Sequence, residues 1–221
     1  MRFKILGGLV LALVFICIIL LAGGLDWFRG WVFIGLLIVG RTISTRYIGR
    51  KDPELLRRRG QIGQGTKTWD LVLLTLFGLT YLAIIVVAAF DAQNHWSQMP
   101  VWLWLIGAVL YVFFVVVITW AMAVNTHFEK TVRIQRDRHH RVIESGPYRI
   151  VRHPGYLATI LGLVLPTPLL LGSWWAFIPT ILAMAFLILR TVLEDRTLRK
   201  ELSGYEAYTQ KVRYRLLPGL W

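Results

Sequence analysis

The chain has 221 residues, enough for one domain; 56% of them are hydrophobic, 17% are charged and the mean hydropathy is +0.58. This balance is rare in a soluble domain. The net charge of +13 is also typical of nucleic-acid binding. Here, however, the basic residues flank apolar runs, which indicates membrane topology and contact with anionic lipid headgroups rather than a nucleic-acid partner.

Six apolar segments follow one another, and each approaches the roughly 20 residues that cross a bilayer core as a helix. They are 5–23, 27–48, 69–90, 101–124, 156–171 and 174–193. The first follows Arg2 and Lys4, as in a signal peptide, but it is longer than a signal core and lacks a clear cleavage motif, so we expect a retained span. The pattern predicts an all-α integral membrane bundle of about six transmembrane helices.

Lys and Arg residues gather on one side of these spans. If the N-terminus lies in the cytoplasm, the cytoplasmic pieces hold all of the 25 Lys and Arg residues except Arg29. Those pieces are 1–4, 41–68, 125–155 and 190–221. The positive-inside rule therefore predicts that both termini are cytoplasmic. Seven tryptophans near span ends fit an interfacial aromatic belt: Trp27, Trp31, Trp69, Trp96, Trp102, Trp174 and Trp175.

Only Gly172 and Ser173 separate the last two apolar segments, which predicts an antiparallel helical hairpin. Its first arm contains Pro166 and Pro168, so we expect a kink whose freed backbone groups are covered by neighbouring protein. The chain therefore reads as a single membrane domain, 1–221. Four spans lie in 1–124, and loops, the hairpin and a cytoplasmic tail lie in 125–221.

A short basic helix is predicted between the second and third spans. Asp52 suits the N-cap and Pro53 the first helical position. The run Arg57-Arg58-Arg59 follows within two turns. We expect this segment to lie at the membrane interface, where basic side chains face lipid headgroups.

Polar side chains gather at the cytoplasmic ends of the spans, in the stretches 125–141, 145–156 and 190–218. Ionisable residues are nearly absent from the middle of the spans, which disfavours an ion-coupled transporter. Because the hairpin returns to the side that it left, the second and third stretches must meet in space. Their meeting point is the candidate site.

In the second stretch, Pro154 can open the hairpin helix, whose N-terminus offers N–H groups and a partial positive charge to a carboxylate or phosphate. Arg152 and His153 add donors, and Gly155 lets a ligand approach the backbone. Tyr156 can pack on a flat ring or a cation. The alternative is a basic flank that only starts a helix.

In the third stretch, Arg190 and Glu194 lie four residues apart and so share one helical face at the membrane edge. They are either a surface ion pair of little energetic value or a functional pair. In the functional interpretation Glu194 accepts hydrogen bonds from sugar hydroxyls and Arg190 clamps an anion bidentately. His127, His139 and His140 match no strong metal-ligand spacing, so we predict solvated loop histidines and no metal site.

Three motifs now point to a family. Ser145-Gly146-Pro147-Tyr148, the run 152–156 and Glu194-Asp195, in this order around a hairpin, resemble the membrane-bound isoprenylcysteine carboxyl methyltransferase and phospholipid methyltransferase superfamily. The tail at 212–218 is similar to the ending of that family. The segment 52–56 resembles one that bacterial members tend to carry, which implies a bacterial inner membrane.

The resemblance implies S-adenosylmethionine as the cofactor, bound at the cytoplasmic face between the hairpin and the loops. It assigns the cofactor to Gln135, His140, Arg141, Val142, Ile143, Tyr148, His153, Pro154, Gly155, Tyr156 and Glu194. It places Arg190 as the catalytic residue facing the methyl acceptor. The chain departs from the family in having Glu194-Asp195 where Glu-Glu is usual. The spacing from Gln135 to Tyr148 is also shorter than in the eukaryotic carboxyl methyltransferases.

The resemblance implies methyl transfer to a lipophilic acceptor drawn from the bilayer, with membrane lipids as the surroundings and the oligomeric state open. This in-line displacement mainly needs alignment and exclusion of water. A carboxylate acceptor needs no general base, whereas a protonated amine does, and no Asp or Glu is obviously free to be one. We therefore expect carboxyl O-methylation of an isoprenylcysteine-like substrate. Its tail is expected to enter between 101–124 and 156–193.

Three alternatives stay open on the sequence. One is N-methylation of a phospholipid amine. Another is a membrane reductase that uses NADPH, because sterol reductases resemble this superfamily in fold and carry a related Arg-His-x-x-Tyr segment. Glu194-Asp195 and the Val-Arg-x-Arg-Leu-x-Pro tail favour methyl transfer over reduction. The third is a small transporter or scaffold, against which the lack of charges at mid-span argues.

Overall fold

The computed structural model describes residue 24 and residues 26–221, and every regular element in this part is a helix. The elements are α2 (Phe28–Lys51), α3 (Pro53–Arg58), α4 (Thr68–Asn94), α5 (Val101–Val124), η2 (Arg136–Arg138), η3 (Gly146–Arg149), α6 (Pro154–Ala158), η4 (Thr159–Val164), α7 (Thr167–Leu171), α8 (Phe177–Glu201) and α9 (Tyr205–Lys211). Five helical stretches are long and apolar enough to cross a membrane: α2, α4, α5, the run Pro154–Leu171 and α8. The predicted helical membrane bundle is confirmed, while the first predicted span, 5–23, lies outside the described residues.

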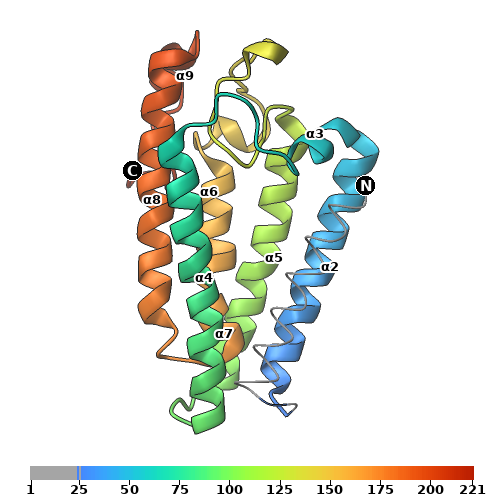
Figure 1. The fold of residues 1–221 in the computed structure, drawn as a ribbon, viewed down its shortest axis with the longest axis vertical. Helices are drawn as coiled ribbons and strands as arrows, with labels where there is room; N and C mark the ends of the chain where they lie inside the picture. Colours follow the sequence, from blue (N-terminus) through green and yellow to red (C-terminus); the bar gives the residue numbers. More distant parts are fainter. Residues whose placement is uncertain (1–23, 25) are drawn as a thin grey trace.

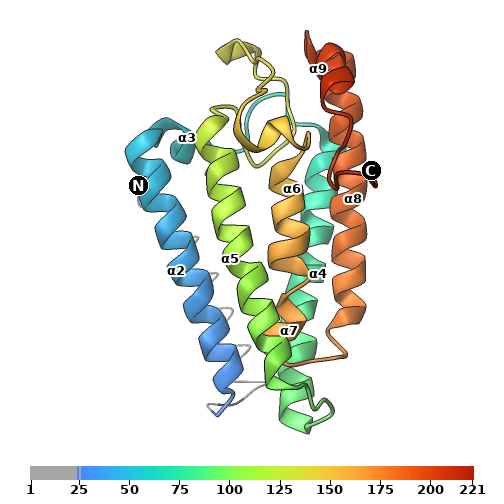
Figure 2. The ribbon, with the colours of Figure 1, turned by 180° about the vertical axis from the view of Figure 1, so that it is seen from behind.

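The first arm of the hairpin forms the centre of the bundle (Figures 1 and 2). This arm, made of α6, η4 and α7, packs against α5 on one side and against α4 and α8 on the other, while α2 covers the outer side of α5. It is the most buried of the five spans. A Cβ at Gly162 would lie 2.5 Å from the Cβ of Phe114 and 2.7 Å from its backbone nitrogen. Glycine therefore permits the close contact of η4 with α5.

The predicted proline kink is present at Pro166, where η4 ends and α7 begins. The carbonyl of Leu163 accepts a hydrogen bond from the Thr167 hydroxyl (2.6 Å), which in turn lies 3.1 Å from the hydroxyl of Tyr81 on α4. The two hydroxyls thus tie the segment around the kink to α4, and neighbouring protein covers polar groups there. Gly172, with a φ of +79°, turns the chain toward α8.

Helix α8 extends beyond the predicted apolar span, which ends at residue 193, to Glu201. Its last eight residues are mostly Glu, Arg, Lys and Leu, which favour helix, so α8 continues from the apolar region into the polar end without a break. The short helix α3 is also confirmed. The Asp52 carboxylate accepts from the Leu55 N–H (2.9 Å), and Pro53 occupies the first turn.

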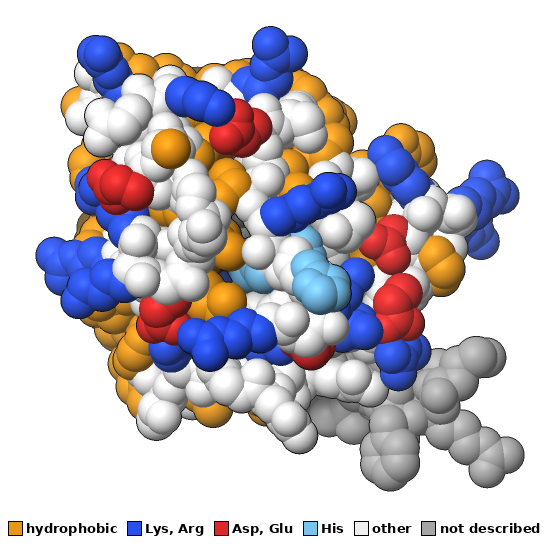
Figure 3. Space-filling model, turned by 90° about the horizontal axis from the view of Figure 1, so that it is seen from above, with side chains coloured by type: hydrophobic (Ala, Val, Ile, Leu, Met, Phe, Trp, Pro, Cys, Tyr) orange, Lys and Arg blue, Asp and Glu red, His pale blue; other side chains and the backbone are white. Residues whose placement is uncertain are grey.

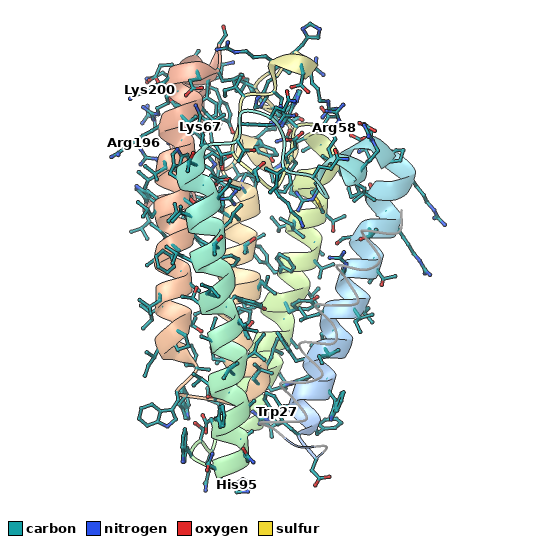
Figure 4. All side chains as sticks on the ribbon, viewed as in Figure 1. Trp27, Arg58, Lys67, His95, Arg196 and Lys200 are labelled. Carbon is teal, nitrogen blue, oxygen red and sulfur yellow. The ribbon has the colours of Figure 1, made fainter. Side chains whose placement is uncertain are left out.

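The longer loops and the short helices α3 and α9 gather at one end of the bundle (Figure 1). Arg58, Lys67 and Lys200 lie at this end, and Trp27 and His95 lie at the opposite end (Figure 4). Lys and Arg side chains spread over this face, with histidine near its middle (Figure 3). Among the described residues, the segments 41–68, 125–155 and 190–221, which were predicted to be cytoplasmic, therefore lie at one end of the molecule.

Candidate active site

A cavity of about 310 Å³ lies at the loop-rich end. Its size is at the lower end of small-molecule pockets, which span roughly 300–1,000 Å³. Every residue predicted for the site lines it: Gln135, His140, Arg141, Val142, Ile143, Tyr148, His153, Pro154, Gly155, Tyr156, Arg190 and Glu194. The stretches 145–156 and 190–218 therefore meet as predicted. The roles of these residues toward a cofactor remain predictions.

The carboxylate of Glu194 is held at one point only. The hydroxyl of Tyr156 donates to its Oε2 at 2.5 Å, and Oε1 has no hydrogen-bond partner among the described residues. The interpretation of Arg190 and Glu194 as a surface ion pair is wrong, because Arg190 pairs with a different acid. A half-buried carboxylate with a free oxygen, fixed by a neutral phenol, can accept from a ligand's hydroxyl or ammonium group.

Arg190 forms a buried ion pair with Asp70, near the start of α4. Its Nε lies 2.6 Å and its Nη2 3.2 Å from the Asp70 oxygens, and Nη2 also donates to the carbonyl of Lys130 (2.6 Å). The guanidinium lies 5.2 Å from the ring centre of Tyr156. The bidentate clamp that we expected to hold an anion thus holds Asp70, and only Nη1 is left for a ligand. This corrects the expected role of Arg190 as a free clamp.

Asp70 was not among the residues predicted for the site, although its position in the sequence was a signal. It is fully buried and also accepts the N–H of Val132 at 2.8 Å. An aspartate beside an apolar run of membrane length is rare and usually paired or functional. Through its two contacts Asp70 joins α4 to both α8 and the loop after α5.

Asp195, next to Glu194, is the centre of a second buried network. It is fully buried, and side chains from three parts of the chain converge on it. The donors are Arg152 Nε (2.8 Å) and Nη2 (3.2 Å), Arg215 Nε (3.0 Å), Arg199 Nε (3.2 Å) and the Tyr205 hydroxyl (3.1 Å), and the His153 Nε2 lies at 3.2 Å. The network joins the hairpin start, α8 and the C-terminal tail.

The network changes the expected role of two residues. Arg152 uses its remaining Nη1 on the carbonyls of Val212 (2.8 Å) and Arg213 (2.7 Å), and His153 directs its Nε2 to Asp195. Both side chains were expected to donate to a ligand. They line the cavity, but their donors mainly hold the tail in place.

Gln135 organises the loop after α5 from inside. Its side chain is almost fully buried; its Nε2 donates to the carbonyl of His127 (2.7 Å), and its backbone N–H points at Nδ1 of His140 (3.4 Å). The rings of His127 and His140 lie 4.6 Å apart. The prediction of solvated histidines is wrong for the buried His127 and the half-buried His140, and it holds for the exposed His139.

Burial lowers the pKa of His140 to about 4, with the neighbouring charges of His127 and Arg133 acting in the same direction, and burial also lowers the pKa of His127. Both rings are therefore neutral at pH 7. In the unfolded chain His titrates near 6.5, so acid favours the unfolded state as the pH falls from about 6.5 toward 4. We expect stability to fall in this window, and to fall less in His140→Gln. Thermal unfolding in detergent between pH 7.5 and 4.5 measures both; parallel curves would contradict this expectation.

Part of the chain is similar to a known family. Residues 105–200 match the model of the isoprenylcysteine carboxyl methyltransferase family. No curated protein sequence matches the chain. The match spans most of α5, the loop with Gln135, the hairpin and nearly all of α8, so the predicted resemblance is confirmed there. It supports a membrane methyltransferase.

The site also uses residues before the family segment. Arg133, inside the segment, is buried and pairs with Glu129 (2.7 Å). A Cβ at Gly63 would lie 2.3 Å from its Nε, so the α3–α4 loop lies directly on this pair. The Lys67 N–H donates to the carbonyl of Val132 (3.1 Å). The loop between α3 and α4 thus packs against the loop after α5, whose residues Val132 and Arg133 line the cavity.

The acceptor tail was expected to enter between α5 and the hairpin, and Ile118 of α5 and Thr159 of the hairpin both line the cavity, so this route stays a prediction. Helix α5 packs along α6, η4 and α7, and a Cβ at Gly155 would lie 2.5 Å from the ring of Phe128. Gly155 therefore admits Phe128, where we had expected it to admit a ligand. The apolar lining of the cavity includes Leu74 and Phe77 from α4 and Leu187 from α8. An acceptor tail has apolar surface on that side of the cavity.

Proposed function

We propose that the chain transfers a methyl group from S-adenosylmethionine to the carboxylate of a lipophilic, isoprenylcysteine-like acceptor at the cytoplasmic face of the membrane. One observation carries the proposal. Glu194, inside the segment that matches the methyltransferase family, projects into a membrane-end cavity with one carboxylate oxygen free and the other held by Tyr156.

The donor set of the cavity fits this cofactor. The free oxygen of Glu194 suits the hydroxyl or ammonium groups of a nucleoside with an amino-acid tail. Tyr148 and the neutral ring of His140 offer flat surfaces for a base. Burial raises the pKa of Tyr148, so its phenol is protonated at neutral pH. S-adenosylmethionine supplies, when bound, a methyl group on a positively charged sulfonium, which is already a good electrophile.

The protein's own share of the reaction is positioning and exclusion of water. Tyr156 fixes the carboxylate of Glu194, and Asp70 fixes Arg190, which lines the cavity and keeps Nη1 without a hydrogen-bond partner among the described residues. Apolar side chains such as Leu187 complete the wall. Alignment of reacting groups in such a site can account for several kcal/mol of barrier lowering.

The state of the acids supports a carboxylate acceptor. Near the cavity, Asp70 is paired with Arg190, Glu129 with Arg133 and Asp195 with Arg152. Among the described residues that line the cavity, this leaves Glu194, and it already accepts from a phenol. A protonated amine would need a base to take its proton, whereas a carboxylate needs none.

Replacing Glu194 with Ala is expected to weaken S-adenosylmethionine binding at least about tenfold, because a charged acceptor is lost from the site. The fold should survive, since Glu194 makes no ion pair with any described residue. Calorimetry in detergent measures the affinity, and Glu201→Ala, an exposed acid on the same helix, is the control. Unchanged binding would remove Glu194 from the site.

A parallel titration of the wild-type chain with NADPH, expected to show no binding, tests the reductase alternative.

A further inference from the structure

The three consecutive arginines that end α3 differ in their partners. Arg57 and Arg58 both bind Glu54, at 2.7 and 2.6 Å, and Arg58 also lies 3.5 Å from Asp137. Arg59, the residue at the C-cap of α3, instead lines the cavity. Within the described part of the chain it makes no ion pair.

The contacts of Arg59 leave most of its charge unbalanced. Its Nη1 donates to the carbonyl of Phe128 at 2.9 Å, and its guanidinium lies 5.0 Å from the centre of the Phe128 ring. A carbonyl and a ring face stabilise a cation only in part. Taking a guanidinium out of water without a counter-charge is costly. Arg59 is only half-buried, so this cost is partial, and an anion in the cavity would reduce it.

The other arginines of the cavity do not share this state. Arg133, Arg152 and Arg190 each pair with a buried acid, and Arg141 is exposed to solvent. Burial lowers the pKa of Arg59 to about 10, and the charges of Arg190 and Arg41 act in the same direction. Arg59 is still cationic at neutral pH. It is thus a partly desolvated positive charge that lines the same cavity as Arg190.

We propose that Arg59, which lines the cavity together with Arg190, binds the carboxylate of the methyl acceptor and so makes the enzyme selective for acidic lipids. The inference rests on the proposed function and assigns a specificity role to a residue outside the segment matched by the family model. A guanidinium presents paired N–H donors in the geometry of a carboxylate, and Arg59 has donors left after its single bond to Phe128. It would hold the acceptor's charge while the cofactor binds to the Glu194 side.

Two probes separate this role from others: N-acetyl-S-farnesylcysteine and the same molecule with a carboxamide in place of the carboxylate. The affinity of the full chain for each probe is measured in neutral detergent with S-adenosylhomocysteine present. This measurement does not depend on methyl transfer. The wild-type chain should prefer the carboxylate about tenfold or more. Arg59→Gln should lose most of this preference while its affinity for S-adenosylmethionine is unchanged. Arg59→Lys should keep part of the preference, because it keeps the charge.

The matched control is Arg57→Gln, which removes an exposed, ion-paired arginine from the same run. It should behave as the wild type. An unchanged carboxylate preference in Arg59→Gln, or a loss of S-adenosylmethionine affinity instead, would overturn the inference, the latter by assigning Arg59 to the carboxylate of the cofactor. If Arg59→Gln loses the carboxylate preference of the wild type but the wild type transfers no methyl group to the carboxylate, the proposed function fails and the assignment of Arg59 stands. If the wild type shows no preference, the inference fails whatever the turnover.

Discussion

Asp195→Ala is expected to lower the free energy of unfolding by about 3–5 kcal/mol, the cost typical of removing one partner of a buried ion pair. Asp195 is fully buried and is the counter-charge of Arg152, whose side chain is only 2% exposed. Without it the guanidinium of Arg152 stays buried and unpaired. Arg215 and Tyr205 lose their contact with α8 at the same time. The tail and the start of the hairpin should therefore loosen together.

Denaturant titration in detergent measures this loss, and limited proteolysis reports whether the tail after α9 becomes accessible. The control is Glu206→Ala, which removes an exposed acid 3.6 Å from Arg199. It should change the free energy of unfolding by less than about 1 kcal/mol. Equal effects of the two substitutions would show that the Asp195 network does not hold the tail.

Arg190→Met is expected to abolish methyl transfer and to cost a similar 3–5 kcal/mol of stability, because Asp70 is left as a buried, unpaired charge. The loss of activity alone would not separate a role in the site from a role in the fold. The double variant Arg190→Met with Asp70→Asn separates these two roles. It removes both charges and keeps an oxygen that can accept the N–H of Val132.

The double variant should recover much of the lost stability, since replacing a buried ion pair by neutral groups is often nearly neutral. Its turnover should remain absent, while S-adenosylmethionine still binds. Denaturant titration and a labelled-methyl transfer assay on the same preparations supply both readouts. Recovery of turnover in the double variant would show that Arg190 acts only through its pairing with Asp70. Asp91→Asn, a change at the other buried aspartate of α4, is the control for helix stability.

Local patterns made the helices predictable. Apolar length located the spans from residue 27 onward, because a bilayer core requires runs of about 20 residues. Gly172 and Pro166 marked the hairpin turn and the kink because each restricts or permits specific backbone angles. The true end of α8 was less predictable. Charged residues end an apolar run without ending a helix.

The candidate site was predictable as a set of residues but not as a set of contacts. The motifs at 145–156 and 190–194 line one cavity, as the return of the hairpin required. The partner of Arg190 was not foreseen, because Asp70 is 120 residues away in the chain. Several acids on different helices could pair with such an arginine, and their spacing in the sequence does not indicate which of them lies closest in the fold.

The sequence by itself determined that this is a helical membrane protein with its charges at one end, since hydropathy and charge placement act on each segment separately. It also determined which residues gather at that end. Only the tertiary structure decided how the charges are balanced: Asp70 with Arg190, Asp195 with Arg152, and Arg59 with no acid among the described residues. The reason is that the energy of a buried charge depends on its nearest neighbours in space, and packing of α3, α4 and α8 brings those neighbours from distant parts of the chain.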